Sequence, residues 1–246
     1  MKATARIFCL LIAAALALTV LATCKPPADD DDGDPDEWVD DGEWVYDFMA
    51  DGDAVLESGS GWYVDGGYTG QAPEGWWMGR TSVAAPYLFT GDFTAEFEFY
   101  LKYFSTEDNM YRFAFRLVDP NWETASEKYC SLAAYYTAFP VDGDAYYTVS
   151  QGNGHYSYVD RAGNIPGVTS GVNTCTLTRS GSTVTMSMNG TLVDTITIEA
   201  VNEPPLGYAP LVHGHNSTDE AETNFYIRKL TVTYTPGEVV EHDWNE

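Results

Sequence analysis

Apolar and polar residues alternate in short runs along most of this chain, and this period-two pattern predicts β-strands. Residues 183–188 alternate Val184, Met186 and Met188 with threonine or serine. Asn189-Gly190 follows, and both residue types tolerate the positive φ that a two-residue hairpin turn requires. Residues 192–198 are then the return strand of a β-hairpin.

One detail of this hairpin predicts an irregularity. In an uninterrupted return strand, Leu192, Ile196 and Ile198 would lie on the face opposite to Val193. A β-bulge near Asp194-Thr195 would return Ile196 and Ile198 to the side of Val193, because one extra residue reverses the facing of everything after it.

From residue 46 onward, similar short runs are separated by Gly, Asp, Asn, Pro and Ser, and no long helical pattern occurs. This organisation predicts an all-β, two-sheet antiparallel sandwich. Together with the hairpin, the predicted strands are residues 45–49, 62–64, 76–80, 93–103, 110–118, 129–137, 146–150, 157–159, 174–179, 183–188, 192–198, 209–213 and 224–234.

The run 93–103 has the clearest alternation. One face carries Phe and other apolar residues, and the other face carries Glu96 and Glu98. Residues 110–118 alternate Phe113 and Phe115 with Arg112 and Arg116 in the same way. If these two strands are neighbours in one sheet, their aromatic rows form one side of the core, and the glutamates meet the arginines on the opposite face.

These motifs resemble a known fold family. A strand, the turn Arg179-Ser180-Gly181, an alternating strand, Asn189-Gly190 and a return strand resemble the late strands of concanavalin A-like (lectin/glucanase, laminin-G-like) jelly rolls. Gly91-Asp92-Phe93 and the strand 225–234 fit the same pattern, so the resemblance covers residues 46–235. It implies a jelly roll, an architecture that carries lectins, hydrolases and adhesion modules.

The N-terminus predicts export. Lys2 and Arg6 precede an apolar run at residues 7–20, which is shorter than a membrane-spanning helix and is typical of a signal peptide. Residues 21–24 end in Cys24 and resemble a bacterial lipobox, although Thr23 replaces the usual Gly or Ala. The resemblance implies a lipid on Cys24 of an exported chain, at the outer membrane or cell surface of a bacterium. The alternative is an ordinary secretory signal in which Cys24 is incidental.

The acidic charge is concentrated at the ends. Removing residues 1–23 changes the formal net charge from −25 to −27, which argues against binding nucleic acid and limits membrane attachment to the N-terminal lipid. Residues 24–43 contain a run of Asp and several Pro, and predict an extended, disordered acidic tether. The sandwich is expected at residues 44–236, followed by a frayed acidic tail at 237–246.

Two cysteines remain after Cys9 is removed with the signal and Cys24 is lipidated. Cys130 and Cys175 both lie on predicted strands, and an exported chain favours a disulfide between them. The alternative is a pair of small buried thiols.

The resemblance also allows a test for hydrolysis. Glycoside hydrolases need two carboxylates, and family 16 enzymes of this fold carry them as Glu-x-Asp-x-x-Glu on one strand. The nearest match here is residues 96–101, in which Glu98 replaces Asp and Leu101 replaces the final Glu. Leu101 cannot act as an acid or a base, so the motif argues against that activity.

Two further groups could bind a ligand. His213 and His215 share a strand face, and Asp219, Glu220 and Glu222 follow in a loop. The His-x-His pair could bind a transition metal and the carboxylate loop could bind Ca²⁺, and of the two metals Ca²⁺ is favoured over Zn²⁺. The alternative is a set of solvated polar residues at the rim of the sandwich.

Aromatic residues make up 14% of the chain, more than a sandwich core alone needs. Exposed rings beside Asn, Asp or Gln suit the faces of sugars. The stacking candidates are either Trp76 or Trp77, together with Trp122 and Tyr156. The candidates for hydroxyl partners are His213, His215 and Asn216.

The leading interpretation is a surface-anchored, lectin-like lipoprotein that binds a glycan without catalysis. Its net charge favours neutral polysaccharides unless Ca²⁺ bridges an acidic one. The alternatives are a polysaccharide-degrading glycoside hydrolase of the same fold and an adhesion module that binds protein.

Overall fold

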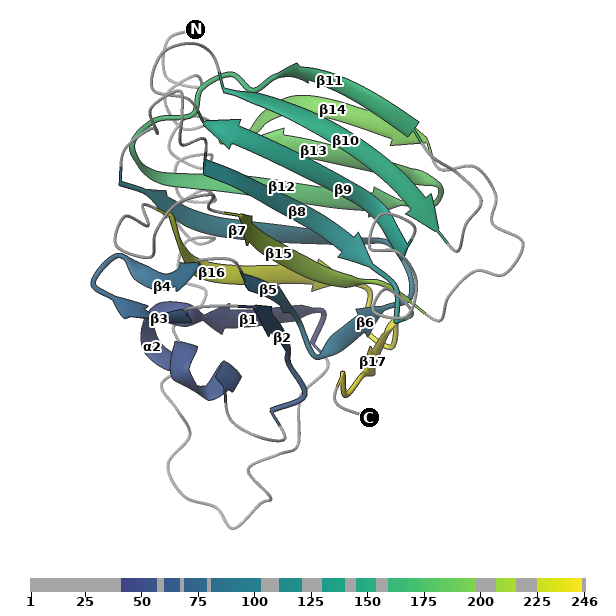
Figure 1. Ribbon diagram of the computed structural model, residues 1–246. Helices are drawn as coiled ribbons and strands as arrows, with labels where there is room; N and C mark the ends of the chain where they lie inside the picture. The colour runs from purple at the N-terminus through teal and green to yellow at the C-terminus, as the bar shows by residue number, and fades with distance from the viewer. Residues whose placement is uncertain are drawn as a thin grey trace, which may run out of the picture. The chain divides into compact units, whose positions relative to one another are not determined.

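Two antiparallel β-sheets pack face to face in the part of the chain that the structure describes (Figure 1). The computed structural model describes residues 41–56, 60–66, 69–78, 81–102, 111–120, 130–139, 145–153, 159–197, 207–215 and 225–244. All of them belong to one unit, Asp40–Glu246. The predicted signal peptide, Cys24 and most of the tether lie outside the described residues.

The eight-stranded sheet, called sheet A here, has β7 and β16 at its centre. Its order is β14-β13-β12-β7-β16-β4-β3, and β1 pairs with β16 beside β4. The strands are β1 (Glu43–Asp47), β3 (Thr69–Ala72), β4 (Gly75–Met78), β7 (Phe93–Leu101), β12 (Gly171–Ser180), β13 (Thr183–Met188), β14 (Thr191–Thr197) and β16 (Phe225–Tyr234).

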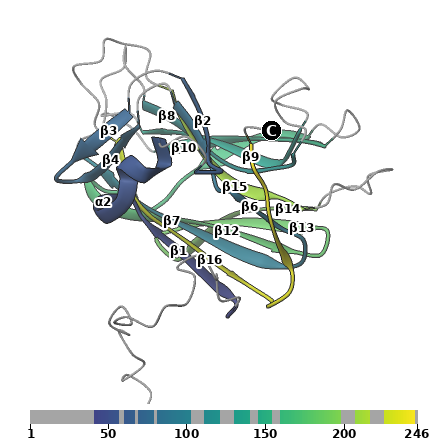
Figure 2. The ribbon, with the colours of Figure 1, turned by 90° about the horizontal axis from the view of Figure 1, so that it is seen from below.

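The seven-stranded sheet, called sheet B, has the order β11-β10-β9-β8-β15-β5-β2. Seen from below, it forms a layer separate from sheet A (Figure 2). Its strands are β2 (Tyr63–Gly66), β5 (Thr81–Ala84), β8 (Tyr111–Val118), β9 (Cys130–Phe139), β10 (Tyr146–Asn153), β11 (Val159–Asn164) and β15 (Ala209–His215).

Aromatic side chains fill the space between the sheets. The ring of Phe115 on β8 lies 5.3 Å from Phe97 and 5.5 Å from Phe99 on β7, and Phe113 stacks on Phe225 of β16 at 3.6 Å, measured between ring centroids. All five rings are buried. Burial of such rings supplies the main favourable term for folding.

Residues 93–103 and 110–118 are not neighbours in one sheet. β7 pairs with β12 and β16 in sheet A, whereas β8 pairs with β9 and β15 in sheet B. The two aromatic rows do meet, but across the core. Because the polar faces of β7 and β8 point away from each other on opposite sides of the sandwich, the predicted pairs between the glutamates and the arginines do not form.

The predicted hairpin and its bulge are confirmed. Asn189 has φ of 49° and Gly190 has φ of 76°, so the turn uses the left-handed conformations that these residues tolerate. The register shifts between Met186, which pairs with Asp194, and Ser187, which pairs with Leu192. Val193 is the extra residue, and the shift places Ile196 in the core while Leu192 is 61% exposed.

An aromatic cluster closes one end of the core, next to α2 (Phe48–Asp51) and the 3₁₀-helix at Gly52–Leu56. The ring of Phe48 stacks on Trp76 at 5.6 Å, and Trp62 lies 5.7 Å from Trp44. Of the chain's seven tryptophans, the four whose side chains are described are all buried: Trp44, Trp62, Trp76 and Trp244. The high aromatic content therefore serves the core to a greater extent than the sequence predicted.

The C-terminal segment is folded, contrary to the predicted frayed tail at 237–246. β17 (Val239–Glu241) pairs with β6 (Tyr87–Phe89). Beyond it, the indole Nε1 of Trp244 donates a hydrogen bond of 2.8 Å to the backbone oxygen of Ala85. Trp244 packs in a small apolar cluster with Leu88, Val118 and Leu211, on the outer side of sheet B.

The predicted disulfide between Cys130 and Cys175 is not present. Cys175 is a free, fully buried thiol on β12, between Phe97 and Met188 in the register of sheet A. Cys130 begins β9, in the other sheet. Burial raises the pKa of the Cys175 thiol well above its ordinary value, which keeps it protonated and unreactive.

Candidate functional site

Each sheet has an outer face that the core does not use, and the two faces differ in chemistry. On sheet A, the outward positions of β7 and β12 carry Thr94, Thr178 and other threonines, and the hydroxyls of this pair lie 3.1 Å apart. Threonine is favoured on such a half-exposed, pleated surface. This face therefore has an ordinary structural explanation.

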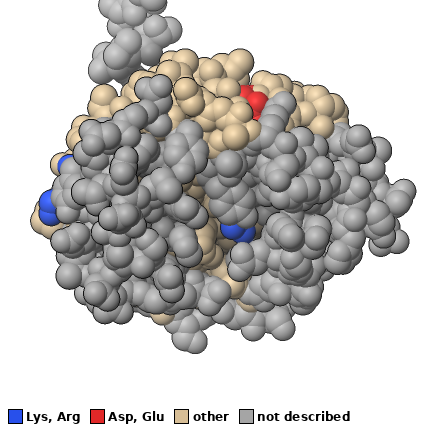
Figure 3. Space-filling model, turned by 45° about the horizontal axis from the view of Figure 1, so that its top comes forward, with Lys and Arg blue, Asp and Glu red and all other residues tan. Residues whose placement is uncertain are grey.

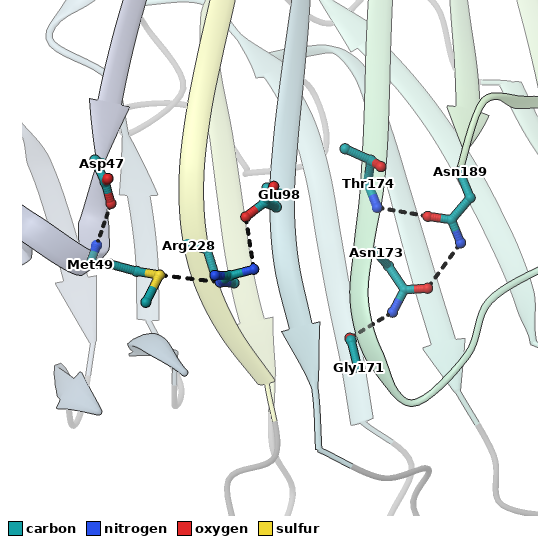
Figure 4. Close-up of polar contacts among 8 residues, drawn as sticks. All are labelled: Asp47, Met49, Glu98, Gly171, Asn173, Thr174, Asn189 and Arg228. Carbon is teal, nitrogen blue, oxygen red and sulfur yellow. Dashed lines mark hydrogen bonds and ion pairs between the residues drawn. The ribbon is translucent and has the colours of Figure 1, made fainter. Parts of the chain in front are cut away.

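The two glutamates of the hydrolase-like motif also lie on the outer face of sheet A. Glu98 forms an ion pair with Arg228 of β16, with Oε1 and Nη1 3.0 Å apart, and Arg228 Nε lies 3.2 Å from the sulfur of Met49 (Figure 4). Glu96 is exposed and has threonines beside it in the register on both neighbouring strands. With Leu101 buried in the core, the strand lacks the third member of the motif, and Glu98 is already matched by a cation.

The outer face of sheet B is defined by alternation along β8 and β15. Phe113, Phe115 and Val212 point into the core, so the residues between them belong to the outer face. Ala114 is opposite His213 in the register, and Arg116 is opposite Leu211. The outer face is therefore polar in the middle and apolar toward the cluster around Trp244.

Ser82 and His213 form a pair on this face, between the middle strand β8 and the edge strand β2. They are directly opposite each other on β5 and β15, and the serine Oγ lies 2.6 Å from the imidazole Nδ1. Ser82 is buried, whereas His213 is partly exposed. Among the described side chains of β5, β8 and β15, His213 is the polar one that solvent reaches. Since the hydrogen bond fixes its ring, His213 is held in one orientation at the surface.

Basic residues occupy neighbouring register positions on β8 and β15. Arg112 and His215 are opposite each other in the register of β8 and β15, one pair along from Ala114 and His213, while Arg116 lies one pair along in the other direction. The five strands β5, β15, β8, β9 and β10 contain no Asp or Glu at all, in a chain with 37 acidic residues. One small group of basic atoms is visible near the middle of the space-filling view (Figure 3).

The sequence-predicted site residues are only partly brought together. His213 and His215 both lie on β15, and the side chain of His213 is in the site. Trp76 is removed from the candidates, because its ring is fully buried against Phe48 and cannot stack on a ligand.

The side chains of the other predicted site residues lie outside the described part of the chain. Trp77 is on β4, and its side chain is outside the described part of the chain, as is that of His215. Trp122, Tyr156 and Asn216 lie entirely outside the described residues, as do the loop carboxylates Asp219, Glu220 and Glu222. Within the described ranges, no group of three His, Cys, Asp or Glu residues could hold a metal ion, and no helix there is long and apolar enough to span a membrane.

Sequence reasoning missed Ser82 and the basic positions. β5 contributes only Thr81–Ala84, and a run of four residues carries too little alternation to predict a strand. Arg112 and Arg116 would meet the glutamates of β7 only if β7 and β8 were neighbours in one sheet. Once β7 and β8 are placed in different sheets, these arginines need another explanation.

Comparison with known proteins supports the fold. No family model matches the chain, and no curated protein matches it by sequence. Among solved structures, the CBM2 module of Lactobacillus casei BL23 phage J-1 evolved Dit matches with a TM-score of 0.55 at 11% identity, covering 79% of this chain and 97% of its own. The Crh5 transglycosylase in complex with NAG matches with a TM-score of 0.53 at 16% identity, covering 80% and 86%.

A third match is the carbohydrate recognition domain of Emp47p, with a TM-score of 0.52 at 13% identity, covering 82% of this chain and 99% of that domain. At these identities, the matches establish the fold. The chain folds as a two-sheet antiparallel jelly roll, the fold that the resemblance of its late strands implied.

Proposed function

We propose that this protein binds a glycan through the outer face of sheet B and does so without catalysis. The observation that carries the proposal is the Ser82–His213 pair, which holds a partly exposed imidazole in one orientation on that face. A fixed polar group on a rigid sheet is the arrangement by which a binding site orients a sugar. Matches of this fold that are described as a carbohydrate recognition domain and as a transglycosylase bound to NAG support a role with carbohydrate.

Two observations favour binding over hydrolysis. Acid–base cleavage of a glycosidic bond needs two carboxylates on either side of the bond. The five central strands of sheet B carry none, and Glu98 on sheet A is matched by Arg228. Hydrolysis would require a pair of carboxylates from residues outside the described ranges, and an assay for released reducing sugar tests for this activity.

The N-terminal features complete the proposal. Cys24 follows an apolar signal and precedes the acidic tether, so the sandwich is held by a lipid at the outer membrane or cell surface of a bacterium and faces external glycans. Mass spectrometry of the mature protein should find a diacylglyceryl group on Cys24. Cleavage elsewhere without lipid would remove the anchor but leave the binding proposal standing.

The test is a glycan array with full-length protein in neutral detergent, with and without Ca²⁺. Binding should fall strongly for His213→Ala and measurably for Ser82→Ala, because the serine positions the ring. The matched control is Thr178→Ala on the outer face of sheet A, which should bind as the wild type does. Release of reducing sugar from a bound glycan would establish the hydrolase alternative. An array without any hit would favour the adhesion module.

A further inference from the structure

The five central strands of sheet B contain basic residues and no acidic ones, in contrast to the chain as a whole. They combine two arginines and two histidines with no carboxylate, whereas the chain has a formal net charge of −25. The acidic residues of this sheet are confined to its margins: Asp65 on the edge strand β2, Asp160 on the edge strand β11 and Asp119 just beyond β8. We propose that the outer face of sheet B selects an acidic glycan, a polysaccharide whose sugars carry carboxylate or sulfate groups.

The proposal rests on the glycan-binding function proposed above and names the class of ligand. Arginine is suited to this class, because its planar guanidinium donates two parallel hydrogen bonds to a carboxylate or sulfate. It also replaces the expectation of a neutral polysaccharide, which was drawn from the net charge of the whole chain.

The register places two of the basic residues opposite each other on neighbouring strands. Arg112 and His215 are directly opposite each other, and residues so paired on antiparallel strands have Cα atoms about 5 Å apart. An arginine and a histidine opposite each other on neighbouring strands can both donate hydrogen bonds to one acidic group. An acidic group bound above the pair satisfies both residues at once.

Small residues occupy the register positions beside these cations. Ala138 and Ala134 of β9 are the neighbours of Arg112 and Arg116, and Ala114 separates the two arginines along β8. Bulky or acidic residues at these positions would fill the space over the sheet or neutralise the arginines. Arg116 itself is 2% exposed and makes contacts of its own, so it contributes a fixed charge beneath the face. Arg112, His213 and His215 occupy the other basic register positions of this face.

The experiment measures binding of full-length protein in detergent to three polymers by titration calorimetry. Polygalacturonate carries carboxylates, dextran sulfate carries sulfates, and dextran is neutral. We expect polygalacturonate, dextran sulfate or both to bind, with an affinity that falls as sodium chloride is raised. The comparison of the two acidic polymers shows which anionic group is preferred.

Substitutions locate the binding face. Arg112→Gln and His215→Gln should each weaken binding of the acidic polymer by about tenfold or more, the cost of one charge-assisted hydrogen bond. Asp65→Asn should tighten it, since it removes an acidic residue opposite Ser82 in the register. Lys229→Gln is the matched control, because Lys229 lies opposite Glu98 on the outer face of sheet A. The melting temperature of each variant confirms that it is folded.

The outcomes separate this inference from the function on which it rests. Binding of neutral glycans with no binding of acidic ones overturns the inference and keeps the proposed function. Acidic binding that Lys229→Gln weakens, while Arg112→Gln and His215→Gln leave it unchanged, places the ligand elsewhere and overturns the inference. A failure of every glycan to bind overturns both.

Discussion

Trp244 should be one of the most important residues for stability, although it is two residues from the end of the sequence. Its side chain is only 8% exposed, and it covers the apolar cluster formed by Leu88, Val118 and Leu211 on sheet B. Its indole also donates the 2.8 Å hydrogen bond to Ala85, and its ring meets His242 edge-on at 4.5 Å. Trp244→Ala removes all of these contacts.

The expected loss can be worked out from these contacts. Truncation of a buried Trp to Ala costs about 3–5 kcal/mol, which includes the cavity and the apolar surface left behind. The lost hydrogen bond leaves the Ala85 oxygen to find another donor, at a cost of about 1 kcal/mol within that range. For a domain of this size, each kcal/mol lowers the melting temperature by about 2–4 °C. Trp244→Ala should therefore melt about 6–20 °C below the wild type.

Differential scanning calorimetry of the full-length protein measures this shift. Trp244→Phe is the control, since it keeps an aromatic ring in the cluster but loses the indole N–H, and it should retain most of the stability. A stop codon after Pro236 should destabilise at least as much as Trp244→Ala, because it also removes β17. If that truncation melts at the wild-type temperature, the C-terminal segment contributes nothing and the reasoning is wrong.

Three further results are expected. Cys175 should resist thiol reagents until the protein unfolds, and the melting temperature should not change with reductant, since burial raises its pKa and it forms no disulfide. Asn189→Ala should cost about 1–3 kcal/mol by chemical denaturation, because it strains a positive φ and removes three side-chain hydrogen bonds, whereas Asn189→Gly avoids the strain. Burial raises the pKa of Tyr87, and the charge of Glu241 raises it further. The contribution of Tyr87 to stability should therefore be complete below about pH 10 and lost as pH rises further, and Tyr87→Phe should reduce this alkaline dependence.

Alternation along the chain predicted which residues face the core but not which strands are neighbours. The inward row of β7 and the hairpin at Asn189-Gly190 follow from local pattern and turn chemistry, and both are found in the structure. The partner of β7 could not be predicted in the same way. Rows such as Phe97 and Phe115 alternate identically whether their strands pair within one sheet or face each other across the core.

The prediction of a frayed tail at residues 237–246 was wrong for a different reason. Acidic residues and Pro236 give residues 237–246 the composition of a solvated tail. One buried Trp and a strand of three residues outweigh that composition, because β6 offers an open edge with which β17 can pair. Composition averages over a segment, whereas packing depends on a single side chain at one position.

The sequence predicted His213 as a residue of the candidate site but did not predict Ser82. The His-x-His pattern on β15 identified His213, since residues two positions apart on one strand share a face. Ser82 is 131 residues away in sequence and meets His213 only after β5 and β15 pair. The pairing of β8 with β15 places Arg112 opposite His215. A site formed across strands follows from sheet order, which the local pattern does not contain.

Sheet order also changes what the net charge of the protein implies for its ligand. At physiological ionic strength, charges are screened over about 8 Å, so a group bound above Arg112 and His215 experiences those residues more strongly than charges further away. The overall negative charge still acts while an acidic glycan approaches the protein. Added salt should therefore have two opposite effects: it weakens the bound complex by screening the arginines, and it relieves the long-range repulsion during encounter. Surface plasmon resonance should show a dissociation rate that rises with salt while the association rate does not fall. An association rate that instead falls steeply with salt would mean that long-range attraction drives the encounter, which a chain of this charge could produce only if the basic face dominated its field.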